Sequence, residues 1–146
     1  VNNYRGLQMS KLKHFRHSYA ELAKNGRKYY NDDNFCTVIG LAVACDLSFG
    51  KAYNLAKRTV NRSHRRGLKV HAIHKLYESM GKVLIPCPSP CKTLSTLKRS
   101  VPPTGRYMFL TASHCAVSRD GIIEDWCAEN PRRLPIETTF KIEDIL

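Results

Sequence analysis

Three residues of this sequence have the chemistry needed for catalysis by a thiol: Cys36, His114 and Asp125. Cys36 follows the turn-forming residues 31–34 and opens an apolar run, so we expect it in the first turn of a helix. A helix N-terminus carries partial positive charge, which favours the nucleophilic thiolate form of a cysteine. We expect His114 on a strand among apolar neighbours, where an unpaired imidazole would be costly. A thiol, an imidazole base and an orienting carboxylate are the parts of cysteine-dependent acyl transfer.

The spacing between His114 and Asp125 predicts that their side chains meet. Asp120-Gly121 between apolar runs is typical of a two-residue hairpin turn, which pairs position 116 with position 125. Residues 114 and 116 share a face of their strand, and a cross-strand pair also shares a face. Asp125 is therefore expected on the same side as His114, one diagonal step away. The alternative interpretation is that Cys36 is a core cysteine and His114 a core histidine with an ordinary partner.

The elements that must position these side chains are expected to be helical in the first part of the chain. Apolar residues recur at helical spacing, and Gly26 stands where a C-terminal cap glycine belongs. The run after residue 34 is apolar on every face, which predicts a fully buried helix. The expected helices lie at 8–25, at about 35–45, after the cap residue Ser48, at 69–80, and from Thr93 to about Arg99.

The second part of the chain changes to a strand pattern. Residues 105–126 predict two strands joined at Asp120-Gly121, and residues 136–142 predict a third. The proline-rich segment 85–91 is interpreted as a connection. Helices followed by antiparallel strands define the α+β class, and 146 residues are enough for one domain with one substantial core.

The charge of the chain is strongly basic and uneven. There are 24 Lys and Arg residues against 12 Asp and Glu, for a net charge of +12. Residues 1–119 hold 21 of these basic residues and five acids, whereas residues 120–146 hold three and seven. This balance favours an anionic partner, such as nucleic acid or an acidic host protein, or else a solvated basic surface. The candidate anion-binding residues lie in and beside one loop: Arg58, Arg62, Arg65, Arg66 and Lys69.

The sequence does not favour a membrane segment, a metal or a cofactor. No window holds eighteen consecutive apolar residues, and the first residues lack the apolar core of a signal peptide, so we expect a cytoplasmic protein with reduced thiols. His71 and His74, with Cys87 and Cys91, offer nitrogen and sulfur ligands for zinc, but their spacing is not a standard zinc pattern. The alternative for Cys87 and Cys91 is a linker stiffened by prolines.

Residues 34–58, NFCTVIGLAVACDLSFGKAYNLAKR, resemble the cysteine-bearing helix and the following helix of papain-like cysteine peptidases. The pattern is most similar to the bacteriocin-leader-processing type and its small relatives, many of which are phage-encoded. The segments at 93–94, 103–107, 113–117 and 120–125 are similar to later motifs of the same family, in the same order. The resemblance covers about residues 31–127.

This resemblance implies a papain-like fold, with N-terminal helices packed on a C-terminal antiparallel sheet. Cys36 would be the nucleophile, His114 the general base and Asp125 the orienting acid, acting on a peptide or protein without a cofactor. The family places a glutamine upstream of the cysteine to hold the oxyanion. Here Asn31 is the candidate replacement, with Asn34 next.

The domain is then divided into a basic N-terminal helix (1–30), a papain-like core (31–127) and an acidic C-terminal segment with a strand (128–146). The leading expectation is a papain-like cysteine hydrolase with a Cys-His-Asp triad, possibly phage-encoded and then acting in the host cytoplasm. The alternative is a catalytically inactive scaffold of the same fold, which binds nucleic acid or inhibits a host protein through its basic surface.

Overall fold

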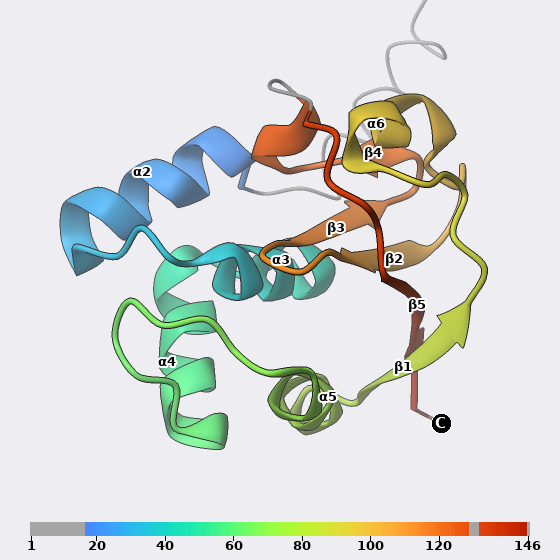
Figure 1. Ribbon diagram of the computed structural model, residues 1–146. Helices are drawn as coiled ribbons and strands as arrows, with labels where there is room; N and C mark the ends of the chain where they lie inside the picture. The colour runs from blue at the N-terminus through green and yellow to red at the C-terminus, as the bar shows by residue number, and fades with distance from the viewer. Residues whose placement is uncertain (1–16, 129–131, 146) are drawn as a thin grey trace, which may run out of the picture.

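The computed structural model describes residues 17–128 and 132–145, in which helices come first and an antiparallel sheet follows (Figure 1). The α+β class expected from the sequence is confirmed. The helices are α2 (Tyr19–Tyr30), α3 (Cys36–Cys45), α4 (Phe49–Val60), α5 (Val70–Ser79) and α6 (Leu97–Ser100), with short 3-10 turns η1 (Leu94–Thr96) and η2 (Trp126–Ala128). The strands are β1 (Lys82–Cys87), β2 (Arg106–Leu110), β3 (Cys115–Arg119), β4 (Ile122–Ile123) and β5 (Thr138–Asp144), in the spatial order β1-β5-β2-β3-β4.

Helix α3 is the buried centre of the molecule, as its all-apolar sequence predicted. Its residues 37–44 are all buried, and the helix packs against β3. The next helix begins as expected, because the Ser48 hydroxyl accepts a hydrogen bond from the Lys51 backbone N–H. Within the described residues no single helix is long and apolar enough to cross a membrane. Only α3 and α4 taken together reach that length and apolarity, and they are bent by 111° at the break between them.

Helix α2 differs from the expected helix at 8–25, of which residues 8–16 lie outside the described residues. The helix begins after its cap residue Ser18 and continues through Gly26 to Tyr30. Gly26 is not a cap. A Cβ there would lie 2.7 Å from the Phe49 ring and 2.8 Å from the Phe35 ring, so glycine allows this helix to pack closely on its neighbours.

The strand expected before Asp120 is divided by a turn into two antiparallel strands, β2 and β3. The Thr111 hydroxyl causes this division, because it accepts hydrogen bonds from the backbone N–H groups of Ser113 (3.3 Å) and His114 (2.9 Å). The Asp120-Gly121 hairpin is confirmed, with Arg119 paired to Ile122. The strand β1 was missed, since its sequence was interpreted as part of a proline-rich connection; the third expected strand is β5.

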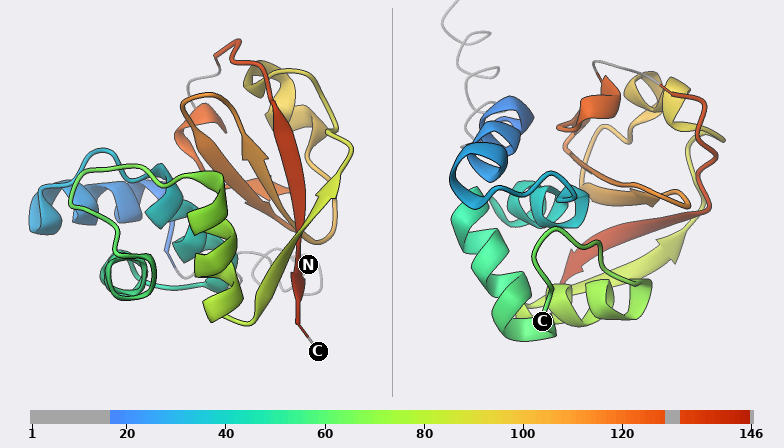
Figure 2. Two further views of the ribbon diagram at one scale, coloured as in Figure 1. Left: turned by 60° about the horizontal axis from the view of Figure 1, so that its bottom comes forward. Right: turned by 60° about the vertical axis from the view of Figure 1, so that its left-hand side comes forward.

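Both faces of the sheet are covered by apolar side chains. Residues of β2 and β3 alternate between the faces: Met108, Leu110 and Val117 join the core under α3 and α5, whereas Phe109 and Ala116 join a smaller core under η1 and α6. Figure 2 shows helices α2 to α5 gathered on one side of the sheet and α6 on the other. Cys36, His114 and Asp125 lie where the helical part meets the sheet.

Candidate active site

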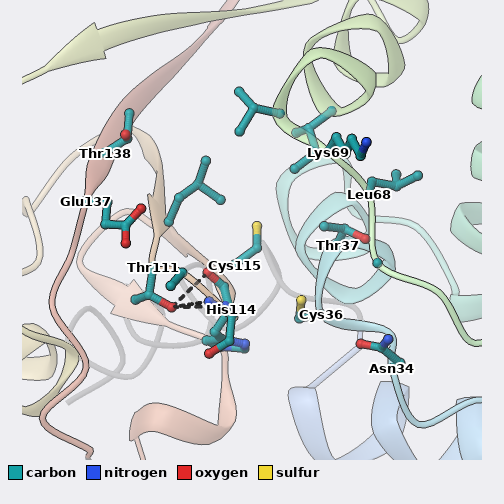
Figure 3. A pocket seen from close by; sticks show the side chains of 16 residues that line it. Asn34, Cys36, Thr37, Leu68, Lys69, Thr111, His114, Cys115, Glu137 and Thr138 are labelled. Carbon is teal, nitrogen blue, oxygen red and sulfur yellow. Dashed lines mark hydrogen bonds between the residues drawn. The ribbon is translucent and has the colours of Figure 1, made fainter.

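Cys36 is the first residue of α3, where its thiol faces the sheet part of the molecule (Figure 3). The helix has no side-chain cap, because its N-terminal flanking residue is Phe35. The backbone N–H of Cys36, in the first turn of the helix, therefore has no partner within the helix. This is the position that the sequence predicted for a nucleophilic cysteine.

His114 lies immediately before β3, in the turn that joins this strand to β2. Its Nε2 is 2.8 Å from Asp125 Oδ2, and both side chains are buried, at 7% and 5% exposure. The same carboxylate oxygen accepts a hydrogen bond from the Cys127 backbone N–H at 3.0 Å. The Trp126 ring lies against the imidazole, with 4.5 Å between ring centroids. These contacts fix the ring and leave Nδ1 as the nitrogen available to Cys36.

The surroundings of His114 favour its charged form. Burial by itself lowers the pKa of the imidazole, but hydrogen bonds and charge interactions with Asp125 and Cys36 outweigh burial and raise that pKa to about 9. The ring is therefore an imidazolium at neutral pH. The positive charge of an imidazolium stabilises a neighbouring thiolate. The three predicted residues are thus brought together: Cys36 at the start of α3, His114 just before β3 and Asp125 just after β4.

The segment before Cys36 is held by a buried arginine. Arg62 pairs with Asp32 (Nη1 to Oδ2, 2.8 Å), and its Nη2 donates to the Asn34 carbonyl at 2.8 Å. Its Nε donates to the Arg66 carbonyl at 2.7 Å. Arg62 was predicted to bind anions, but its guanidinium faces inward and is fully engaged by the protein. Arg62 therefore holds in place the segment 32–34, which leads into α3.

The other predicted anion-binding residues are only partly brought together. Arg65 is exposed and forms a two-pronged contact with Asp33. Arg66 and Lys69 line a surface cavity of about 270 Å³ between the loop and α5, and Arg58 is exposed in the last turn of α4. The loop therefore presents fewer unpaired cations than its sequence indicates.

The structure does not bring Asn31 to the site. Asn31 is an exposed cap residue at the end of α2, with a left-handed φ of 47°, and it lines neither cavity beside Cys36. Asn34 lines both of these cavities, although its Nδ2 also donates to the Arg65 carbonyl at 3.2 Å. The backbone N–H of Cys36, at the uncapped start of α3, is a further candidate donor for an oxyanion.

Tyr19 is a site residue that sequence reasoning missed. It begins α2 and reaches a cavity that also contains Cys36 and Asp125. Burial and the Asp125 carboxylate raise the pKa of the Tyr19 hydroxyl, so it stays protonated and able to donate a hydrogen bond. Its apolar spacing in the sequence indicated only a packing position. No local signal connects it with residues more than a hundred positions later.

Two cavities flank the Cys36–His114 pair. The larger, of about 580 Å³, extends between α5 and the turn at 111–114, with Lys69 and Glu137 among its polar lining residues (Figure 3). The smaller, of about 320 Å³, extends between α2 and Trp126. Both cavities are lined by Cys36 and His114, so an extended chain that crosses this pair would occupy both.

No metal centre is found among the described residues, which contain no cluster of three or more His, Cys, Asp or Glu side chains placed to hold an ion. All six cysteines have free thiols. Of the candidate zinc ligands, His74 packs against the Phe140 ring and Cys91 Sγ donates to the Thr93 carbonyl. The structure therefore gives these residues other contacts.

Comparison of the chain with protein-family models, curated proteins and solved structures finds no match. Its chemistry must be argued from the site itself. A thiol at a helix start, an imidazolium, a buried carboxylate and an accessible cavity on each side are the parts needed for attack on an acyl group.

Proposed function

We propose that this protein is a cysteine hydrolase of the papain-like type, acting on an amide or isopeptide bond of a peptide or protein. One observation carries the proposal: Cys36 at the start of α3 faces His114, whose Nε2 is 2.8 Å from the buried Asp125. The chain order Cys-His-Asp and the passage from helices to antiparallel strands both fit the resemblance of residues 31–127 to that family. A phage-encoded enzyme acting in a host cytoplasm is the setting that this resemblance favours.

The proposed reaction uses three side chains, one backbone N–H and water. The Cys36 thiolate attacks the scissile carbonyl carbon, and the backbone N–H of Cys36 stabilises the oxyanion that forms. The His114 imidazolium then gives its proton to the leaving amine, which departs and leaves a thioester. A water molecule loses a proton to His114 and attacks the thioester, releasing the acid and restoring the thiolate. Asp125 keeps the ring in place throughout.

Selective alkylation of Cys36 tests the proposal. Burial raises the pKa values of the Cys45 and Cys115 thiols, whereas Cys36 is partly exposed beside an imidazolium. We expect iodoacetamide at pH 6.5 to modify Cys36 at least about tenfold faster than either of them. Peptide mapping by mass spectrometry measures the three rates in one sample.

The matching activity measurement compares the wild type with Cys36→Ala on peptide libraries and peptidoglycan fragments. Cleavage by the wild type and its loss in Cys36→Ala are expected, while Cys45→Ala serves as the control that keeps activity. Equal alkylation of Cys36, Cys45 and Cys115 would contradict the proposal.

A second candidate function is binding without catalysis, through the basic surface. The cavity lined by Arg66 and Lys69 favours it, since it has cations on its wall and does not include Cys36 or His114, although it adjoins the larger cavity through Lys69. In this proposal the partner is nucleic acid or an acidic host protein, and binding survives Cys36→Ala. Arg62 also lines this cavity, but its guanidinium is engaged by Asp32 and the Asn34 carbonyl.

A further inference from the structure

The smaller cavity beside Cys36 has an unusual concentration of guanidinium groups. One wall comes from α2 and carries Tyr19 and Arg27; the other carries Trp126 and Arg132. Arg27 lies over the Phe35 ring at 5.3 Å and interacts with the Tyr19 hydroxyl, and Arg132 lies over the Trp126 ring at 5.5 Å. Stacking on rings orients both arginines without neutralising their charge.

The carboxylates that border this cavity are already engaged. Asp33 is held by Arg65, with its two oxygens 3.1 and 3.2 Å from Nη2, and Asp125 is held by His114. Within residues 17–128 and 132–145, no ion pair is formed by Arg27 or Arg132 with an acidic side chain. The cavity therefore combines two guanidinium groups and a phenol donor with the Cys36 thiol, which lines the same cavity.

We propose that this cavity binds a carboxylate of the substrate close to the bond that is broken, so that the enzyme selects acidic peptides. The inference rests on the proposed function, whose site supplies the adjoining thiol. Guanidinium groups bind carboxylates through paired, charge-assisted hydrogen bonds. The carboxylate belongs either to an Asp or Glu side chain or to the end of the peptide. The basic surface of the protein attracts either one.

A reagent pair tests the charge of the cavity without any knowledge of the substrate. Iodoacetate is an anion and iodoacetamide is its neutral analogue, so the ratio of their reaction rates at Cys36 reports the local field. We expect Arg27→Gln with Arg132→Gln to lower that ratio about threefold or more. The control is Lys98→Gln with Arg99→Gln, which removes the same charge from exposed positions on α6 and should leave the ratio nearly unchanged. An equal fall in both double variants overturns the proposal.

A binding measurement keeps the proposal separate from catalysis. Trp126 is the only tryptophan of the chain and lines the cavity, so its fluorescence reports occupancy. Cys36→Ala is titrated with two pairs of blocked peptides: one pair differs in Glu against Gln, the other in a free against an amidated C-terminus. We expect the acidic member of one pair to bind about tenfold more tightly, and Arg27→Gln with Arg132→Gln to abolish that difference.

The outcomes of the two measurements separate the two proposals. Preference within the Glu/Gln pair identifies an acidic side chain as the ligand, and preference within the other pair identifies a terminal carboxylate. Equal binding within both pairs, or a preference that persists in the double variant, overturns the carboxylate site. If Cys36 reacts with iodoacetamide no faster than Cys45 but the preference is present, the hydrolase proposal fails and the carboxylate site stands.

Discussion

The hydrogen bond between His114 and Asp125 determines which protonation state of the ring faces Cys36. Asp125 is buried and lies between the imidazole and the Cys127 backbone N–H, so its carboxylate has a fixed direction. The raised pKa of His114, about 9, is the result of this contact and of Cys36 acting against burial. Removing the charge of Asp125 should therefore change the titration of the ring more than its position.

Asp125→Asn is expected to lower the pKa of His114 from about 9, because the charge of Asp125 is lost while burial, which lowers that pKa, remains. Since the wild-type folded-state pKa lies above the unfolded value, the stabilisation from His114 is complete below pH 6.5 and is lost as pH rises to 9. The difference in melting temperature between wild type and Asp125→Asn should therefore shrink between pH 6 and pH 10.

NMR titration of the His114 ring measures the pKa directly, and melting curves at each pH measure the stability. Activity should fall by about a hundredfold or more in Asp125→Asn, as for other orienting acids. Glu137→Gln, which changes a carboxylate of the larger cavity, is the matched control and should leave the titration unchanged. An unaltered pKa in Asp125→Asn would show that another group holds the imidazolium.

The predicted contact between His114 and Asp125 is present, but the strand pairing from which it was derived is not: the Asp120-Gly121 hairpin is paired only at 119–122 and 118–123, and both residues lie just outside the strands. The same reasoning interpreted residues 105–119 as one strand, whereas the Thr111 hydroxyl closes a turn within them. It also chose Asn31 by its distance from Cys36 along the chain. Residues such as Tyr19 and Arg132 reach the site only through tertiary packing, which spacing cannot predict.

At the level of elements, the segment between α2 and α3 determines where the thiol points. Arg62 and Asp32 form a pair whose side chains are 1% and 0% exposed, whereas Arg65 and Asp33 form a pair at the surface, with 50% and 60% exposure. The two pairs lie beside each other in the sequence, so they provide an internal comparison. Only the buried pair should matter to the position of Cys36.

Arg62→Met should lower the free energy of unfolding by about 3–5 kcal/mol, because it leaves the Asp32 carboxylate buried without a partner. Arg65→Met should cost no more than about 1 kcal/mol, as is usual for an exposed ion pair. Urea denaturation measures both, and iodoacetamide alkylation at Cys36 should slow only in Arg62→Met. Similar losses in the two variants would mean that the loop, rather than the buried pair, fixes the start of α3.

The predicted end of α2 at Gly26 and the predicted linker at β1 were both wrong. Helix α2 passes through Gly26, since this glycine serves close packing against Phe35 and Phe49 rather than a cap. Strand β1 contains Pro86, which made its sequence appear to be a linker; the strand is at the edge of the sheet, where a missing N–H is tolerated. Helix α3 was predictable because a run apolar on every face has few alternatives to burial.

For the whole molecule, the net charge of +12 predicts binding to polyanions that depends on salt and not on Cys36. Replacing Arg58, Arg66 and Lys69 together with Gln should make the slope of log affinity for DNA against log salt shallower, by about 0.9 for each phosphate that the variant no longer neutralises. Fluorescence anisotropy with labelled DNA measures the slope.

The matched control replaces Lys92, Lys98 and Arg99, which are exposed near or within α6 and carry the same total charge. An equal effect of the two triple variants would assign the binding to overall charge and would remove the case for a defined basic site. No affinity for DNA at low salt in the wild type would contradict the second candidate function.

The position of β5 determines when the sheet can form during synthesis of the chain. This last strand lies between β1 and β2, so the sheet stays open until residues 138–144 have been synthesised. The thiol leaves the ribosome long before then, but the surface that carries its imidazole partner is not yet assembled. A nascent chain of the proposed hydrolase therefore lacks the completed sheet that carries His114 until its last strand has been added, and the site is expected to form only after that.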